Sequence, residues 1–171
     1  ARRPKQQGIM AAPAMLTYGA DDAGLICGYL FEPEVGTRAI DSTEAAARLA
    51  SLRTDDDSSD GLPHAGPFVW LHFDLSHTAA EPWLRRNADL DETFFEALQD
   101  DLHSTRIERA RQSLIAVIND VHFDFDFEPS DIATLWISVD RNLVVTARRR
   151  PLRSIDELRK AVKRCNDPGS T

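Results

Sequence analysis

The feature that most constrains the fold is the stretch PFVWLHFDL at 67–75, which is apolar at nearly every position. A strand with one face in water alternates apolar and polar residues, whereas a strand covered on both faces is apolar throughout. The stretch therefore predicts a central strand in a sheet that carries helices on both sides. A chain of 171 residues is long enough to bury such a sheet inside one domain.

Further strands are predicted before and after this stretch. Apolar runs bounded by turn residues indicate some of them, and from residue 105 a period of two indicates the others. Two of these strands are joined near Gln112, and Arg141 and Asn142 form the tight turn of a hairpin. The expected strands cover 24–31, 37–41, the two halves of 105–127, 132–140 and 143–149.

Helices are predicted where apolar residues recur every three or four positions. The C-terminal helix is expected to turn Ile155, Leu158 and Val162 toward the sheet. The fold class is therefore α/β, a layered α/β/α domain with a mixed, largely antiparallel central sheet flanked by helices on both faces. The expected helices cover 42–53, 77–86, 90–100 and 154–165, with Ser42 or Thr43, Thr78, Asp91 and Ser154 as their N-caps.

The chain is expected to contain one domain with loose segments around and within it. Residues 1–22 mix basic and apolar groups and are interpreted as a loose N-terminal tail, and 23–166 as the single domain. Within that domain 54–66 is acidic and rich in Gly and Pro, which predicts a mobile loop. Residues 167–171 are interpreted as the start of a linker.

Composition excludes several classes of function. The formal net charge of −8 makes nucleic acid an unsuitable partner, because phosphates repel an acidic protein, and makes cations a natural one. Two cysteines are too few for a disulfide framework, and Cys27 lies in an apolar run that predicts a core position. Glycine-rich phosphate loops and the G-x-S-x-G motif are both absent from the sequence. The chain is therefore not expected to be an enzyme.

The stretch HFDFDFE at 122–128 alternates metal-ligating side chains with phenylalanines. On a strand, His122, Asp124, Asp126 and Glu128 share one face, while the three phenylalanines face the core. Like charges in a row cost stability unless a cation or a basic neighbour offsets them. These four residues are therefore candidate metal ligands. The alternative is that their face of the strand meets solvent, a water-filled space or another subunit.

Two other stretches carry candidate sites. In WLHFDLSH, His72 and Asp74 point to the same face of the predicted central strand, and His77 follows from the turn. The three residues are a second candidate metal site, against the alternative of a hydrogen-bonded histidine in an apolar strand. The basic run ARRRPLR at 147–153 suits an anion or an acidic partner, against the alternative of a solvated strand end.

Taken in order, several segments resemble the cytoplasmic N-terminal domain of CorA-type divalent metal-ion transporters, and within that family the zinc-transporting ZntB branch. The resemblance covers roughly residues 24–164, and it is the ordered set of segments that is specific. The chain departs from the family at NDVHFDFDFEPSD, where relatives continue with an Asn-Leu-Asn-Pro-like segment. The segments that carry the resemblance are GLICGYLF, FVWLHFDLSHTAAEPWLRR, STRIERARQSLIAVIND and TLWISVDRNLVVTARRRPLRSIDELRKAV.

This resemblance implies a domain that forms the inner funnel of a pentameric transporter and senses its ion. In the family a stalk helix and two membrane helices follow, with a Gly-Met-Asn motif at the pore entrance. The expected setting is the inner membrane, with this domain in the cytoplasm. The resemblance requires no resident cofactor, and Zn²⁺ or Mg²⁺ is the transported or weakly bound ion. The alternatives are a magnesium or cobalt channel of the same family and a free-standing regulatory binding domain.

Overall fold

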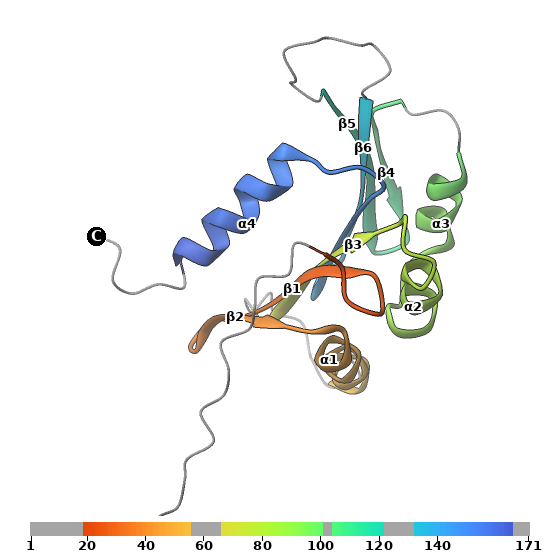
Figure 1. Cartoon of the computed structure of the whole chain (residues 1–171). Coiled ribbons are helices and arrows are strands. Elements are labelled where there is room, and N and C mark those ends of the chain that lie inside the picture. The colour runs from red at the N-terminus through yellow and green to blue at the C-terminus, as the bar shows by residue number, and fades with distance from the viewer. Residues whose placement is uncertain (1–18, 56–65, 101–103, 122–131, 166–171) are drawn as a thin grey trace, which may run out of the picture.

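The computed structural model describes residues 19–55, 66–100, 104–121 and 132–165, which form one seven-stranded sheet with helices on both faces (Figure 1). The strand order is β2-β1-β3-β7-β6-β5-β4. This arrangement confirms the predicted α/β class. The strands are β1 (Leu25–Glu32), β2 (Gly36–Ile40), β3 (Phe68–Asp74), β4 (Arg106–Ala110), β5 (Ser113–Val121), β6 (Ile132–Val139) and β7 (Leu143–Arg148).

The sheet consists of two antiparallel units joined along one parallel seam. Strands β2, β1 and β3 pair antiparallel in the N-terminal unit, and β4, β5, β6 and β7 do so in the C-terminal unit. Strands β3 and β7 pair parallel, from Val69 opposite Leu143 to Asp74 opposite Arg148. The sheet is therefore mixed and largely antiparallel, as predicted, and β3 lies inside it between β1 and β7.

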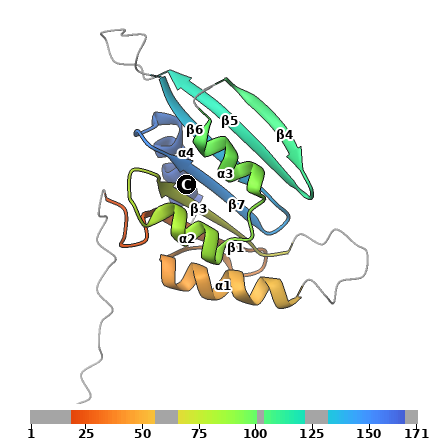
Figure 2. The same ribbon diagram turned by 90° about the vertical axis from the view of Figure 1, so that its right-hand side faces the viewer.

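The helices divide unequally between the two faces. In Figure 2, α1 (Ser42–Asp55), α2 (Ala80–Asn87) and α3 (Glu92–Gln99) lie in front of the sheet, and α4 (Arg153–Cys165) lies behind it. No helix among the described residues is long and apolar enough to cross a membrane. The larger core lies on the three-helix face, and a smaller cluster of Ala133, Leu135, Leu152 and Ile155 attaches α4 to β6.

Strand β3 is buried on both faces, as its apolar sequence predicts. Val69, Leu71 and Phe73 are fully buried in the core beneath α1, α2 and α3. Trp70 and His72 point to the opposite face and are also buried. The stretch is therefore buried on both faces of the sheet.

Three predicted details of the helices are wrong. The Asp41 carboxylate accepts the Glu44 backbone N–H and caps α1, so neither Ser42 nor Thr43 is the N-cap. Helix α2 begins at Ala80 after Ala79, which has no side-chain cap bond, so Thr78 does not cap it. In α4, Leu158 is 47% exposed instead of turned inward, and Arg159 faces the sheet in its place. Asp91 caps α3 as predicted.

The face that carries α4 is covered only in part. Strand alternation and pairing put Ile107, Leu114, Ile118 and Val139 on this face, because Ile118 pairs with Leu135 of the cluster under α4. All four side chains are exposed, Ile107 by 68%. Helix α4 therefore shields the β6 side of this face and leaves an apolar strip across β4 and β5 open.

Gly24 provides a test of how closely β1 approaches α2. Its φ is +83°, and a Cβ added there would lie 2.8 Å from the Ala80 Cβ. We expect Gly24→Ala to lower the free energy of unfolding by about 1–3 kcal/mol, from backbone strain and the clash with α2. Urea unfolding measures this change.

The matched control is Gly19→Ala. A Cβ at Gly19 meets nothing within 4 Å, so the free energy of unfolding should stay within about 0.5 kcal/mol of the parent. Equal stabilities for the two variants would contradict the close approach at Gly24.

Candidate functional site beneath helix α4

A row of polar side chains crosses three strands on the face that α4 covers. Cys27 of β1 pairs with His72 of β3, and His72 pairs with Thr146 of β7. Side chains of directly paired residues project from the same face of a sheet. The three residues therefore lie side by side, and next to them Asp74 pairs with Arg148.

Thr146 joins two side chains of β3 across the parallel seam. Its hydroxyl oxygen accepts a hydrogen bond from Trp70 Nε1 at 2.9 Å and lies 2.8 Å from His72 Nδ1. Because the indole can only donate, the hydroxyl proton goes either to His72 or to the Leu71 carbonyl oxygen at 3.4 Å. In the first case the imidazole proton is on Nε2, and in the second Nδ1–H donates to the hydroxyl oxygen.

His72 is fully buried and electrically neutral. Burial, together with the nearby charges of Arg148 and Arg159, lowers the pKa of its imidazole to about 3. The Nε2 atom of His72 has no hydrogen-bond partner among the described residues. His72 thus has one ring nitrogen in contact with Thr146 and one without a hydrogen-bond partner among the described residues.

Arg159 brings a positive charge from α4 to the polar row. Its side chain is 17% exposed, and its Nη1 lies 3.5 Å from Asp156 Oδ1. Burial raises the pKa of the Cys27 thiol to about 11, against the opposing effect of Arg159 and Lys163. The guanidinium of Arg159 therefore lies close to the β1 side of the row.

Cys27 is not the fully buried core residue that the sequence predicts. It is half-buried and lines a groove of about 620 Å³ between α4 and the β1–β2 hairpin. Arg159 and Lys163 form the α4 side of this groove, and Tyr29 is part of its floor. The groove has a size typical of sites for small molecules.

The second candidate metal site divides into separate local contacts. Asp74 accepts the Ser76 backbone N–H through Oδ1, and His77 Nδ1 accepts the Ala79 N–H at the start of α2. Within the described ranges, no group of three or more His, Cys, Asp or Glu side chains is placed to hold a metal ion. A role for His72 and Asp74 as metal ligands stays a prediction.

The first candidate metal site lies outside the described residues. His122, Asp124, Asp126 and Glu128 follow directly after the end of β5 at Val121. Their role as metal ligands also stays a prediction.

Part of the basic run at 147–153 has a structural role. Arg149 Nη2 donates to the Leu98 carbonyl oxygen at 3.1 Å, and its guanidinium lies 5.4 Å from the centre of the Trp136 ring. Burial lowers the pKa of Arg148, which points toward the face of α4 beside Asp74. Arg149 thus fastens the end of β7 to α3.

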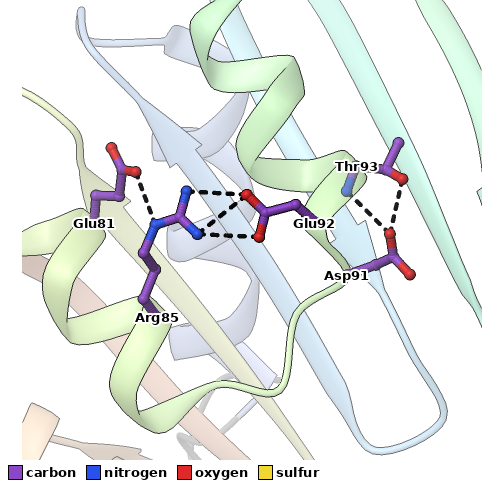
Figure 3. Close-up of polar contacts among 5 residues, drawn as sticks. All are labelled: Glu81, Arg85, Asp91, Glu92 and Thr93. Atoms are coloured by element: carbon purple, nitrogen blue, oxygen red, sulfur yellow. Dashed lines mark hydrogen bonds and ion pairs between the residues drawn. The ribbon is translucent and has the colours of Figure 1, made fainter.

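A second polar cluster, on the opposite face, connects α2 with α3. Figure 3 shows the Arg85 guanidinium between Glu81 and Glu92, with bonds of 3.0 Å to Glu81 and 3.1 Å to Glu92 Oε2. The same guanidinium lies 3.8 Å from the centre of the Phe95 ring. The cluster therefore links α2 to α3 through ion pairs that lie at the surface.

The sequence reasoning did not single out Thr146 or Arg159. The Trp-x-His alternation in β3 is visible in the sequence, but its partner Thr146 lies 74 residues after His72. Arg159 stands one position after Leu158 in an amphipathic helix, and the apolar residue was assigned to the inner face. A buried Trp and His on one strand face signal that a hydroxyl partner is needed on a neighbouring strand.

Neutral His72 makes stability depend on pH. Its folded pKa of about 3 lies below the unfolded value of 6.5, so the unfolded chain binds the extra proton as the pH falls below 6.5. Between pH 7 and pH 4 we expect this group to remove about 3 kcal/mol from the free energy of unfolding.

The measurement is chemical unfolding of the parent and of His72→Gln at both pH values. Carboxylate contributions are common to the two proteins, so the variant should lose less stability on acidification. An identical loss in both would contradict a neutral buried His72.

Sequence comparison finds relatives among divalent-cation transporters. The chain is 28% identical over 139 residues to the divalent cation transporter CmaX of Pseudomonas aeruginosa, covering 81% of this chain and 38% of CmaX. It is 25% identical over 101 residues to the zinc transport protein ZntB of Yersinia enterocolitica, covering 59% of this chain and 31% of ZntB. The chain thus spans about a third of the length of these curated relatives.

Solved structures share the fold. The full-length CmaX structure matches with a TM-score of 0.62 and 27% identity, over 87% of this chain and 42% of CmaX. The ZntB cytoplasmic domain from Vibrio parahaemolyticus matches with a TM-score of 0.59 and 16% identity, over 86% of this chain and 53% of that domain.

The resemblance to CorA-type transporters is confirmed at the level of the family, and the comparisons do not single out the ZntB branch. The model of the CorA-like Mg²⁺ transporter protein family matches residues 66–171, which is more than half of the chain. CmaX shares a larger part of this chain than ZntB does. With this match, and with the sheet and the four helices of its described residues, the chain belongs to the CorA family of divalent-cation transporters.

Proposed function

We propose that this chain is the cytoplasmic domain of an inner-membrane transporter for divalent cations, with Zn²⁺ as the transported ion. The observation that carries the proposal is the family match over residues 66–171 on a domain of the same fold as ZntB's cytoplasmic domain. The part of the longer protein that crosses the membrane is proposed by analogy with CmaX and ZntB, which are much longer than this chain.

The charge of the chain suits a role as an entry funnel. The formal net charge is −8, and five copies around an axis would carry five times that, about −40. A ring of negative charge raises the local concentration of cations, and salt screens the effect over about 8–10 Å. We therefore assign the domain the role of attracting and sensing the ion on the cytoplasmic side of a pentamer.

Zn²⁺ is preferred because zinc transport proteins recur among the relatives. Mg²⁺ is the second candidate, because the matching family model is described as a Mg²⁺ transporter. In either case the domain acts through its field and the acidic stretch 122–128, and it needs no resident cofactor. A free-standing regulatory domain is the rival from another class.

Ion flux through the longer protein tests the proposal. We expect vesicles that contain it to accumulate Zn²⁺, measured with an entrapped zinc dye, and to accumulate Mg²⁺ more slowly at the same concentration. Faster Mg²⁺ entry would assign the ion as Mg²⁺. Vesicles with no flux of either ion would overturn the transporter proposal.

The same assay tests the acidic stretch. Asp124→Asn with Asp126→Asn should raise the Zn²⁺ concentration for half-maximal flux by about twofold or more at low salt, because two charges near the ion path are lost. The control, Asp22→Asn with Asp89→Asn, removes the same charge from two exposed positions and should change this concentration less. Equal shifts in the two variants would remove 122–128 from the ion path.

A further inference from the structure

The sheet face that carries α4 leaves a row of apolar side chains uncovered. Leu114 of β5 pairs directly with Val139 of β6, and Val139 pairs with Val144 of β7. Directly paired residues project from the same face, so these three side chains form one row across the strands, the apolar row. Leu114 is 43% exposed, Val139 is 38% exposed, and Val144 is half-buried. Water therefore reaches apolar side chains on three adjacent strands.

Further apolar side chains extend this surface at both ends of the apolar row. Val144 pairs with Trp70 of β3, and Phe68 lies two positions before Trp70 on the same strand face. Phe31 of β1 pairs with Phe68, their rings stack 4.3 Å apart, and both are half-buried. At the other end Ile107 of β4 is 68% exposed on this face. A contiguous apolar surface that reaches from β1 to β4 marks an interaction site.

Helix α4 covers the neighbouring part of the face and leaves room beside it. It packs on Leu135 of β6, with Ile137 at the edge of the contact. Val139 follows Ile137 by two positions, which is about 7 Å along a strand. Packed helices lie about 8–10 Å apart. A second helix beside α4 would therefore lie over the apolar row.

Helix α4 also presents an apolar side chain on its free flank. Lys163 lines the groove between α4 and the start of β1, where Leu25 lies, whereas the apolar surface continues to Phe31 near the end of β1. Leu158 precedes Lys163 by five residues, which is about 140° around an α-helix, so it lies on the flank turned away from this groove. Leu158 is 47% exposed. A helix on that flank would cover Leu158 together with the apolar row.

Related proteins contain more polypeptide than this chain does. The match covers 53% of the ZntB cytoplasmic domain from Vibrio parahaemolyticus and 42% of full-length CmaX. Nearly half of that cytoplasmic domain therefore lies outside the match. Helices that follow one another through a short connection pack side by side and antiparallel. A segment that follows α4 is thus well placed to turn back over the apolar row.

We propose that an amphipathic helix that follows α4 in the longer protein packs beside α4 and covers the apolar row, with Leu158 at the contact between the two helices. The inference rests on the proposed function in one respect, that this chain is part of a longer protein. The helix would bury Leu114, Val139 and Val144, and it would complete the second helix layer of the domain.

The edge of the sheet disfavours a second copy of the chain as the occupant. Strand β4 is the edge strand beside β5, and it carries Arg106, Glu108 and Arg109. Charged side chains on an edge strand hinder its pairing with another chain. The formal net charge of −8 also makes two copies repel each other. A helix of the same polypeptide meets neither obstacle.

The test compares thiol alkylation in this chain and in the longer protein. Leu114→Cys, Val139→Cys and Leu158→Cys are each treated with iodoacetamide, and mass spectrometry of the modified peptide gives the rate at that position alone. We expect the rate at each position to fall by about tenfold or more in the longer protein, because a thiol reacts only while it is exposed. The assay needs no ion flux, so a failed transport proposal and a failed helix proposal give different results.

Val35→Cys is the matched control, because Val35 is 79% exposed in the turn between β1 and β2. Its rate should be the same in both proteins. Equal rates in the two proteins at any of the three test positions would overturn the proposal. Protection of Leu114→Cys that grows with the concentration of the isolated chain would assign the apolar row to a second copy. Protection that is lost when the longer protein dissociates into single copies would do the same, and either result would overturn the proposal.

Discussion

The parallel pairing of β3 with β7 is the contact on which the rest of the structure depends. Each half of the sheet is antiparallel within itself, and the two halves meet along this pair. The Thr146 hydroxyl, which contacts Trp70 Nε1 and His72 Nδ1, adds side-chain hydrogen bonds across the seam. Because all three groups are buried, each bond lost there leaves a polar atom without water.

The same seam sets the positions of both helix layers. On one face, Val69, Leu71 and Phe73 pack beneath α1, α2 and α3 in an apolar core. On the other face, His72 and its neighbours make a polar floor, to which α4 turns Arg159. The face that carries α4 also keeps an open apolar strip of Ile107, Leu114, Ile118 and Val139.

The sequence predicted the elements whose signals are local. Strand β3 was predicted because nine adjacent residues are nearly all apolar, and the Asp91 cap because it directly precedes an apolar helix. The contact of His72 with Thr146 was not predicted, because it joins residues 74 positions apart. Leu158 and Arg159 are adjacent in one helix, and helical periodicity alone cannot choose which of them faces the sheet. The long aliphatic stem of an arginine allows burial that a polarity rule excludes.

The most direct test of this account is the stability of Thr146→Val against Thr146→Ser in urea. Valine keeps the shape of threonine and removes the hydroxyl, so Trp70 and His72 both lose their partner. We predict that Thr146→Val loses about 2–4 kcal/mol of unfolding free energy and that Thr146→Ser, which keeps the hydroxyl, loses about 1 kcal/mol. A valine variant as stable as the serine variant would contradict the role of this hydroxyl in joining the two halves of the sheet.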